Sequence, residues 1–331
     1  MTDTNRQWRL AARPDGMVRE SDFELVSDPM PRPDEGQLLV RTRLVALEPA
    51  MRGWIEDKPN YLPPVALGAV MRGTGIGEVI ESRLDGYEVG DLVSGMFGWQ
   101  EFAVADGSAR KLPAGVDPTL AISVLGMTGL TAYYGMLEIG RPEPGDTVVV
   151  SGAAGATGSV AGQIARIQGC RVIGIAGGAE KCDWLTGPAR FDAAIDYKHE
   201  DVDTRLAELC PDGIDVFFDN VGGPILNAGL GRLAQGARIV VCGSISSYND
   251  KQKPPGPANY YNLVQKRARM EGFVILDYLP RAAEAIADLA KWVEAGEIAW
   301  KADVQKGFEN VPATLLRLYS GSNFGKQLLE V

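Results

Sequence analysis

A run of small residues, SGAAGATGS at 151–159, has the composition of a phosphate-binding turn. A backbone without bulky side chains lets amide groups approach a pyrophosphate, and the N-terminus of a following helix adds partial positive charge. Aligned with G-x-G-x-x-G, the run places Ala153 at the first glycine, Gly155 at the point of close cofactor approach and Gly158 at the point of close helix–strand packing. The flanking segments are expected to be a strand and a helix, which is the context that the motif requires. We therefore predict a dinucleotide-binding loop; the alternative is a turn that serves only helix packing.

The end of the next expected strand indicates which dinucleotide binds. An NAD site usually carries Asp or Glu there, to hold the ribose 2′-hydroxyl. This strand ends in IAGGAEK (175–181), which has no acid at its tip and has Lys181 close behind. A cation without the acid suits a 2′-phosphate, so the sequence predicts NADP(H). Glu180 is a mild counter-argument, and the alternative for Lys181 is a solvated lysine in the first turn of a helix.

The number of histidines limits the metal sites and nucleophilic triads that the chain can form. His199 is the only histidine, so a site with two histidine ligands cannot be built, and a Ser-His-Asp triad would need His199 itself. It lies in the polar stretch DYKHED, where we expect a loop and a solvated side chain. The cysteines form no C-x-x-C pair and match no common zinc spacing, so we expect free thiols at Cys170, Cys182, Cys210 and Cys242. The sequence predicts no metal site.

The segments that must position these residues alternate between strand and helix after about residue 120. Short β-branched runs predict strands at 146–152, 171–177, 214–223 and 237–244, with helical stretches such as 156–169 between them. A later helical stripe, followed by Gly296 as a C-cap, is formed by Ile286, Leu289, Ala290 and Val293. This alternation predicts a parallel sheet with right-handed crossovers.

The N-terminal part of the chain has a different pattern of residues. Short Val- and Leu-rich runs between Pro- and Gly-rich turns predict an irregular, mainly β domain. The tail at 307–331 predicts a short helix and a last strand, which we expect to pack back on this first domain.

Length and charge narrow the class of protein further. A chain of 331 residues suggests two domains, and 45% hydrophobic with 23% charged residues is typical of a folded globular protein. The net charge of −10, from 33 basic and 43 acidic residues, argues against nucleic acid or an anionic membrane as partner. The polar start MTDTNRQWRLAARPDG shows no secretory signal, and no run of about 18 apolar residues occurs. We expect a cytoplasmic protein.

Nine ordered segments carry a family resemblance over nearly the whole length. They are LEPAMRGWI (47–55), VMRGTGIGEVI (70–80), LGMTGLTAYYGM (125–136), AAGATGSVAGQIA (153–165), GIAGGAEK (174–181), FDNVGG (218–223), CGSISSYN (242–249), RARMEGF (267–273) and GSNFGK (321–326). Through them the chain resembles the medium-chain dehydrogenase/reductases, specifically the zinc-independent branch of prostaglandin, alkenal double-bond and curcumin reductases. The resemblance implies an α/β fold with a GroES-like, mainly β catalytic domain at 1–122, completed by 300–331. It also implies a Rossmann domain with a doubly wound parallel sheet at 123–299, which binds NADPH.

The glycine loop and the resemblance together imply the cofactor contacts. They fall on Thr128, Ala154, Gly155, Ala156, Gly158, Lys181, Tyr197, Asn220, Cys242, Gly243, Ser244, Ile245, Ser246, Tyr248, Phe273, Val274, Ile275 and Asn323. Thr128 is expected near the nicotinamide. Zinc enzymes of the wider family carry Gly-His-Glu in the first domain, where this chain reads Gly68-Ala69-Val70, and the cysteine-rich structural loop is missing.

The resemblance implies reduction of the C=C bond of α,β-unsaturated ketones or aldehydes. Hydride transfer to the β-carbon leaves an enolate, which preorganised hydrogen-bond donors can stabilise without a metal. We expect the cofactor's ribose 2′-hydroxyl and a tyrosine hydroxyl as donors, because tyrosine donates while neutral, its ordinary pKa being about 10. Eukaryotic members place that tyrosine where this chain has Gln265, so we place Tyr248 first and Tyr61 second. Ala50 replaces a third pocket tyrosine of the curcumin reductases and predicts a roomier pocket.

Two other functions stay open at this point. One is an NADPH quinone oxidoreductase, because zinc-free relatives differ mainly in pocket shape. The other is a non-catalytic NADPH-binding sensor, which would keep the loop and Lys181 and would tolerate Ala50 and Gln265. The family also implies a homodimer.

Overall fold

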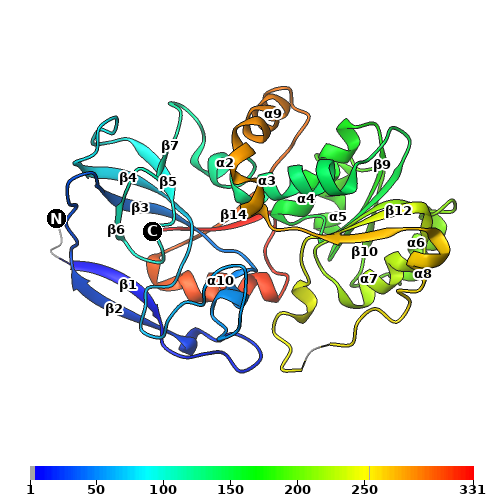
Figure 1. Ribbon diagram of the computed structural model, residues 1–331, viewed down its shortest axis with the longest axis horizontal. Coiled ribbons are helices and arrows are strands. Elements are labelled where there is room, and N and C mark those ends of the chain that lie inside the picture. Colours follow the sequence, from blue (N-terminus) through cyan, green and yellow to red (C-terminus); the bar gives the residue numbers. More distant parts are fainter. Residues whose placement is uncertain (1–3, 253) are drawn as a thin grey trace. The chain divides into compact units, whose positions relative to one another are not determined.

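The computed structural model describes residues 4–252 and 254–331, and these fall into two compact units (Figure 1). Unit 1 contains the chain up to Ile122 together with Ala302–Val331, and unit 2 is Ser123–Lys301. The chain therefore leaves unit 1, forms the whole of unit 2 and returns to unit 1.

Unit 1 is built mainly from strands. They are β1 (Thr4–Leu10), β2 (Phe23–Pro29), β3 (Leu38–Ala46), β4 (Gly75–Ser82), β5 (Leu92–Gly95), β6 (Phe102–Ala105), β7 (Arg110–Lys111), β14 (Ala302–Lys306) and β15 (Lys326–Glu330). β1 and β2 form an antiparallel pair, and the larger sheet has the order β14-β15-β3-β4-β5-β7, with β6 also paired to β3. Its short helices are α1 (Met51–Trp54), α2 (Pro118–Ile122) and α10 (Val311–Tyr319).

The C-terminal segment supplies part of the unit 1 core. β15 pairs antiparallel with β3, through Leu328 opposite Ala46, and parallel with β14. Leu315 of α10 and Leu329 of β15 lie fully buried in the same cluster as Trp99. Removal of this apolar surface from water is the main force that holds the tail there.

Unit 2 has a six-stranded, all-parallel sheet with the order β10-β9-β8-β11-β12-β13. The strands are β8 (Thr147–Ser151), β9 (Arg171–Ala176), β10 (Ala193–Asp196), β11 (Ile214–Asp219), β12 (Leu233–Val241) and β13 (Arg269–Gly272). In chain order this is 3-2-1-4-5-6, the doubly wound arrangement built from two mononucleotide-binding halves. The predicted fold class is confirmed.

Helices precede, connect and follow these strands along the chain (Figure 1). They are α3 (Met127–Tyr134), α4 (Ala156–Ile167), α5 (Ala179–Thr186), α6 (Val202–Leu209), α7 (Gly223–Leu230), α8 (Asn262–Lys266) and α9 (Ala282–Glu294). Short turns of 3-10 or π helix complete the unit at Gly135–Gly140, Ile245–Ser247 and Ile275–Arg281.

The predicted elements of unit 2 form where expected, but two strands have displaced boundaries: the strand predicted at 214–223 ends at Asp219, and the one predicted at 237–244 is shifted at both ends. α4 lies within the predicted helix, and Gly169 follows it with a φ of 84°, a left-handed conformation that suits glycine. α9 contains the predicted stripe and buries Leu289. The strand predicted at 237–244 begins at Leu233 and ends at Val241, because the amides of Cys242 and Gly243 turn to the carbonyl oxygen of Asp219. In the described part of the chain, no helix is long and apolar enough to cross a membrane.

Candidate functional site

The loop between β8 and α4 shows why this stretch contains only small residues. A Cβ on Gly158 would overlap the carbonyl oxygen of Gly152 and lie 3.0 Å from the Cα of Ala153, so only glycine lets α4 pack this close to the loop. Gly155 is the N-cap of α4 and has an extended backbone, and no side-chain hydrogen bond caps the helix. The left-handed turn is made by Gly152, at φ 59°, one position before the alanine that we aligned with the first glycine.

This loop lies where the strand order reverses. β8 and β11 are neighbours in the sheet but begin the two halves of the fold, so their carboxyl ends flank the crevice in which open α/β sheets bind ligands. The Oγ of Ser151, at the end of β8, donates to Oδ1 of Asp219, at the end of β11, over 2.7 Å. The same Oγ accepts the backbone N–H of Asn220 at 2.8 Å, and Nδ2 of Asn220 donates to the Ser151 carbonyl oxygen at 2.7 Å.

The Asp219 carboxyl group also holds its own loop. It accepts the N–H groups of Val221 at 3.0 Å and Gly222 at 3.0 Å. Burial raises its pKa, because desolvation penalises the carboxylate more than the bonds from Ser151, Gly222 and Val221 stabilise it. The loop after β12 is attached here as well. Ile245 N–H donates to the Asn220 carbonyl oxygen at 3.2 Å, and Ser246 Oγ donates to that of Val221 at 2.6 Å.

The tip of β9 carries a second group of predicted residues. A Cβ on Gly177 would lie 2.8 Å from the Tyr197 ring and 2.9 Å from Cε of Lys198, so both side chains lie over this glycine. Lys181, in the first turn of α5, is half-buried. The side chain of Glu180 is 82% exposed, and its carboxylate lies 3.6 Å from Nζ of Lys301.

The carboxylate of the nearby Asp196 is already engaged by two neighbouring groups. Oδ1 accepts the Gly178 N–H at 2.7 Å, and Oδ2 lies 2.7 Å from Nδ1 of His199. The bond from Gly178 and then the contact with His199 lower the pKa of Asp196. The His199 side chain is 74% exposed, which confirms the predicted solvated histidine.

The two candidate tyrosines lie in different units. The hydroxyl oxygen of Tyr248 accepts the Ser244 N–H at 3.3 Å, which holds the ring against the loop after β12. Tyr61 belongs to unit 1, and the residue is 49% exposed. Two positions carry other residues where relatives have a tyrosine: Ala50 is the N-cap of α1, and Gln265 is exposed on α8.

The remaining predicted contacts are spread over several elements. Thr128 lies at the start of α3 and donates from Oγ1 to the Ser123 carbonyl oxygen at 3.0 Å. Phe273 follows β13, and its ring would meet a Cβ on Gly135 at 2.7 Å; Val274 and Ile275 come next. Asn323 belongs to unit 1 and donates from Nδ2 to the Gly325 carbonyl oxygen at 3.2 Å.

Hydrogen bonds therefore join some of the predicted residues and leave others apart. Asn220 and the segment from Cys242 to Ser246 meet at the end of β11, and Tyr248 is tied to that segment. Lys181 and Tyr197 belong to the separate group at the tip of β9. Sequence reasoning missed Ser151, Asp219 and Lys198. Asp219 could have been found from the sequence, because it is an acid that ends a mainly apolar run in IDVFFDN.

The cysteines are free thiols, as predicted. Burial raises the pKa of Cys170 and Cys242 to about 12 and that of Cys182 and Cys210 to about 11, so these thiols stay protonated near neutral pH and are poor nucleophiles.

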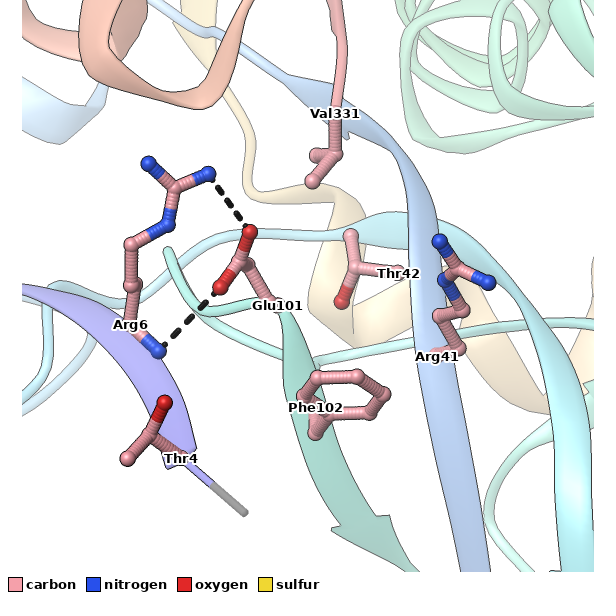
Figure 2. A pocket seen from close by; sticks show the side chains of 7 residues that line it. All are labelled: Thr4, Arg6, Arg41, Thr42, Glu101, Phe102 and Val331. Atoms are coloured by element: carbon pink, nitrogen blue, oxygen red, sulfur yellow. Dashed lines mark hydrogen bonds and ion pairs between the residues drawn. The ribbon is translucent and has the colours of Figure 1, made fainter. Parts of the chain in front are cut away.

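A pocket of about 340 Å³ in unit 1 contains none of the predicted residues (Figure 2). It is lined by Thr4, Arg6, Arg41, Thr42, Glu101, Phe102 and Val331. The Arg6 guanidinium donates to Glu101 at 2.7 Å, and this pair raises the pKa of Arg6. The Glu101 carboxylate thus offsets one of the two guanidinium charges around the pocket.

Two family models match the chain in succession. One, described as the N-terminal domain of oxidoreductase, covers residues 6–112, and the other, described as zinc-binding dehydrogenase, covers residues 156–294. Although the second description names zinc, residues 4–252 and 254–331 bring no three His, Cys, Asp or Glu side chains together as a metal site. The donor set of the described chain does not fit a zinc ion.

Three relatives match over almost the full length. The NADPH-dependent curcumin reductase of Escherichia coli is 42% identical, over 99% of this chain and 97% of the relative. The NADP(+)-dependent 2-alkenal reductase of Nicotiana tabacum is 37% identical, over 99% and 98%. A crystal structure of CurA from Vibrio vulnificus in complex with NADPH matches with a TM-score of 0.94 and 41% identity, over 98% of this chain and 99% of that one.

Proposed function

The chain belongs to the medium-chain dehydrogenase/reductase superfamily, close to its curcumin, prostaglandin and alkenal reductase branch, and we propose that it reduces the C=C bond of α,β-unsaturated ketones and aldehydes with NADPH. It is an NADP-dependent oxidoreductase. The observation that carries the proposal is the glycine-lined loop at the strand-order reversal, in a chain 42% identical to an NADPH-dependent curcumin reductase.

The residues at the crevice fit a dinucleotide. The space that a Cβ on Gly158 would need is taken by the loop backbone, and the extended Gly155 leaves the start of α4 open to a pyrophosphate. Asn220 and the loop after β12 are held by hydrogen bonds on the other side of the reversal point, where the second half of a dinucleotide would lie.

The tip of β9 favours the 2′-phosphate form of the cofactor. Lys181 and Lys198 bring two positive charges to this tip, and Tyr197 can donate from its hydroxyl. The acids beside them are engaged elsewhere: Asp196 by Gly178 and His199, and Glu180 by Lys301. A ribose hydroxyl would find no acceptor of the NAD type here, whereas a phosphate would find cations.

When bound, the cofactor supplies the hydride. The chain's own part is to bind and orient the substrate and to hold a proton donor near its carbonyl oxygen. Tyr248 is the first choice for this role, because the Ser244 N–H, donating to its hydroxyl oxygen, holds that group at the loop after β12, among the residues predicted to contact the cofactor. A neutral donor placed at a developing enolate oxygen stabilises it without a metal ion. Tyr61 is the second choice.

The proposed activity is tested by incubating the protein with NADPH and a conjugated enone, a 2-alkenal or a quinone, with NADH in parallel. We expect NADPH to be consumed with the enone and the alkenal, and the product to be the saturated carbonyl compound. Turnover of the quinone alone would instead assign the protein as a quinone oxidoreductase. Tight binding of NADPH without turnover of any substrate would favour the sensor.

We also propose that the protein forms a homodimer through β13. This strand is an edge of the six-stranded sheet, and Arg269 to Gly272 are all exposed. An antiparallel pairing of β13 with its own copy, centred on Met270, would place each Arg269 opposite the partner's Glu271. The strand is thus complementary to itself in charge, as a twofold interface requires. Exposed apolar side chains on β13 and on the segments before and after it in the chain would add surface to bury: Tyr260, Tyr261, Val264, Met270 and Leu279.

A charge swap tests this interface. Glu271→Arg would oppose two arginines across the axis and should shift the mass in analytical ultracentrifugation from dimer to monomer. Combined with Arg269→Glu, it restores opposite charges and should restore the dimer. Equal masses for all variants would contradict pairing through β13.

A further inference from the structure

Three loops at the strand-order reversal converge on one residue. Asp219 binds the β8 loop through Ser151, and its carboxyl group also binds its own loop through the N–H groups of Val221 and Gly222. Its backbone carbonyl oxygen accepts Cys242 N–H at 2.9 Å and Gly243 N–H at 3.1 Å, which begins the loop after β12. These loops carry half of the predicted contacts to the cofactor, namely Ala154, Gly155, Asn220, Cys242, Gly243, Ser244, Ile245, Ser246 and Tyr248.

Burial at this position disfavours the charged form of an acidic side chain. Asp219 is 1% exposed, and a buried carboxyl group is tolerated only where hydrogen bonds replace its lost water. Ser151 is fully buried and pairs with it from the neighbouring strand. Ser151 belongs to the first mononucleotide-binding half of the sheet and Asp219 to the second, so their bond crosses between the halves.

We propose that Asp219, through Ser151, is a positioning residue that fixes the loops of the nicotinamide half relative to the pyrophosphate loop. The inference rests on the proposed NADPH-dependent function. Asn220 is held by this pair directly, and Ile245 and Ser246 are held one step further, through the carbonyl oxygens of Asn220 and Val221. Without the bond, the adenosine half of the site keeps its own supports, which are Gly158 and the contacts at the tip of β9.

The test compares two ligands that use different parts of the site. NADPH spans both halves, whereas 2′,5′-ADP contains only the adenosine part and its phosphates. Ser151→Ala removes the bridging hydroxyl group, and Asp219→Asn replaces one acceptor oxygen with a donor that would face the Gly222 N–H. Ser82→Ala is the control, because the Ser82 hydroxyl in unit 1 also donates one hydrogen bond and accepts one from a backbone N–H, that of Leu84, but has no carboxylate partner. Dissociation constants for both ligands and the melting temperature are measured for each variant.

We expect each of the two site variants to weaken NADPH binding about tenfold, the effect of losing one charge-assisted hydrogen bond. Binding of 2′,5′-ADP should change less than about twofold, and the control should leave both ligands unaffected. Equal weakening of both ligands would show a general structural role and would overturn the proposal, as would unchanged NADPH binding in a folded variant. Failure of the unmodified protein to bind either ligand would overturn the proposed function itself, and this inference with it.

Discussion

Gly158 lies so close to the backbone of Gly152 that the first turn of α4 leaves no room for a Cβ between them. We predict that Gly158→Ala pushes α4 away from the loop, lowers the free energy of unfolding by about 1–3 kcal/mol and weakens NADPH binding. Thermal unfolding and NADPH titration measure both effects. Gly107→Ala is the matched control, since the nearest atom to its added Cβ is 4.0 Å away. Equal behaviour of the two variants would refute the close approach.

The two lysines at the tip of β9 should determine the preference for NADPH. We predict that Lys181→Ala raises the KM for NADPH about tenfold and leaves the KM for NADH nearly unchanged, because only NADPH carries the 2′-phosphate. Lys198→Ala should act in the same direction with a smaller effect, since this residue is exposed and exposed ion pairs are weak. Steady-state kinetics with both cofactors measure the ratio. Parallel changes for NADPH and NADH would remove the 2′-phosphate assignment.

The hydroxyl group of Tyr248 should matter for turnover more than for cofactor binding. We predict that Tyr248→Phe lowers kcat about 100-fold, as loss of a positioned proton or hydrogen-bond donor does, with little change in the dissociation constant for NADPH. Tyr61→Phe is tested beside it. If Tyr248→Phe keeps full turnover and Tyr61→Phe loses it, the donor is Tyr61.

Acid stability should depend on Asp196. The Gly178 N–H and His199 lower the pKa of this carboxyl group in the folded state, below its unfolded value of about 3.9. Its contribution to stability is therefore fully present above the unfolded pKa and is lost as the pH falls through the folded pKa. We predict that Asp196→Asn lowers the melting temperature near pH 7 and that the difference from the unmodified protein shrinks toward pH 3. A difference that does not vary with pH would contradict this linkage.

The sequence predicted the doubly wound sheet and its loop well, because these depend on local patterns. The conformation of nearby backbone is determined by the β-branched runs, by the apolar stripe on α9 and by the small residues at 151–159. The end of the strand predicted at 237–244 was placed too late, since the chain turns there to reach Asp219, which is more than twenty residues earlier.

The contacts across the sheet could not be read from the sequence in the same way. Ser151 and Asp219 are 68 positions apart and meet only because β8 and β11 are neighbours. Gly152 was missed because the motif alignment placed the first glycine one position later, and φ values decide which residue makes the turn. Lys198 was missed because its side chain reaches Gly177 from the adjacent strand connection.

The most direct test of the central claim follows the hydride itself. The protein is given a conjugated enone and NADPH that carries deuterium at the nicotinamide carbon that donates hydride, and the product is examined by NMR. We predict a saturated ketone with deuterium on the former β-carbon. Deuterium on the carbonyl carbon of an allylic alcohol would contradict double-bond reduction and would assign the protein as a carbonyl reductase.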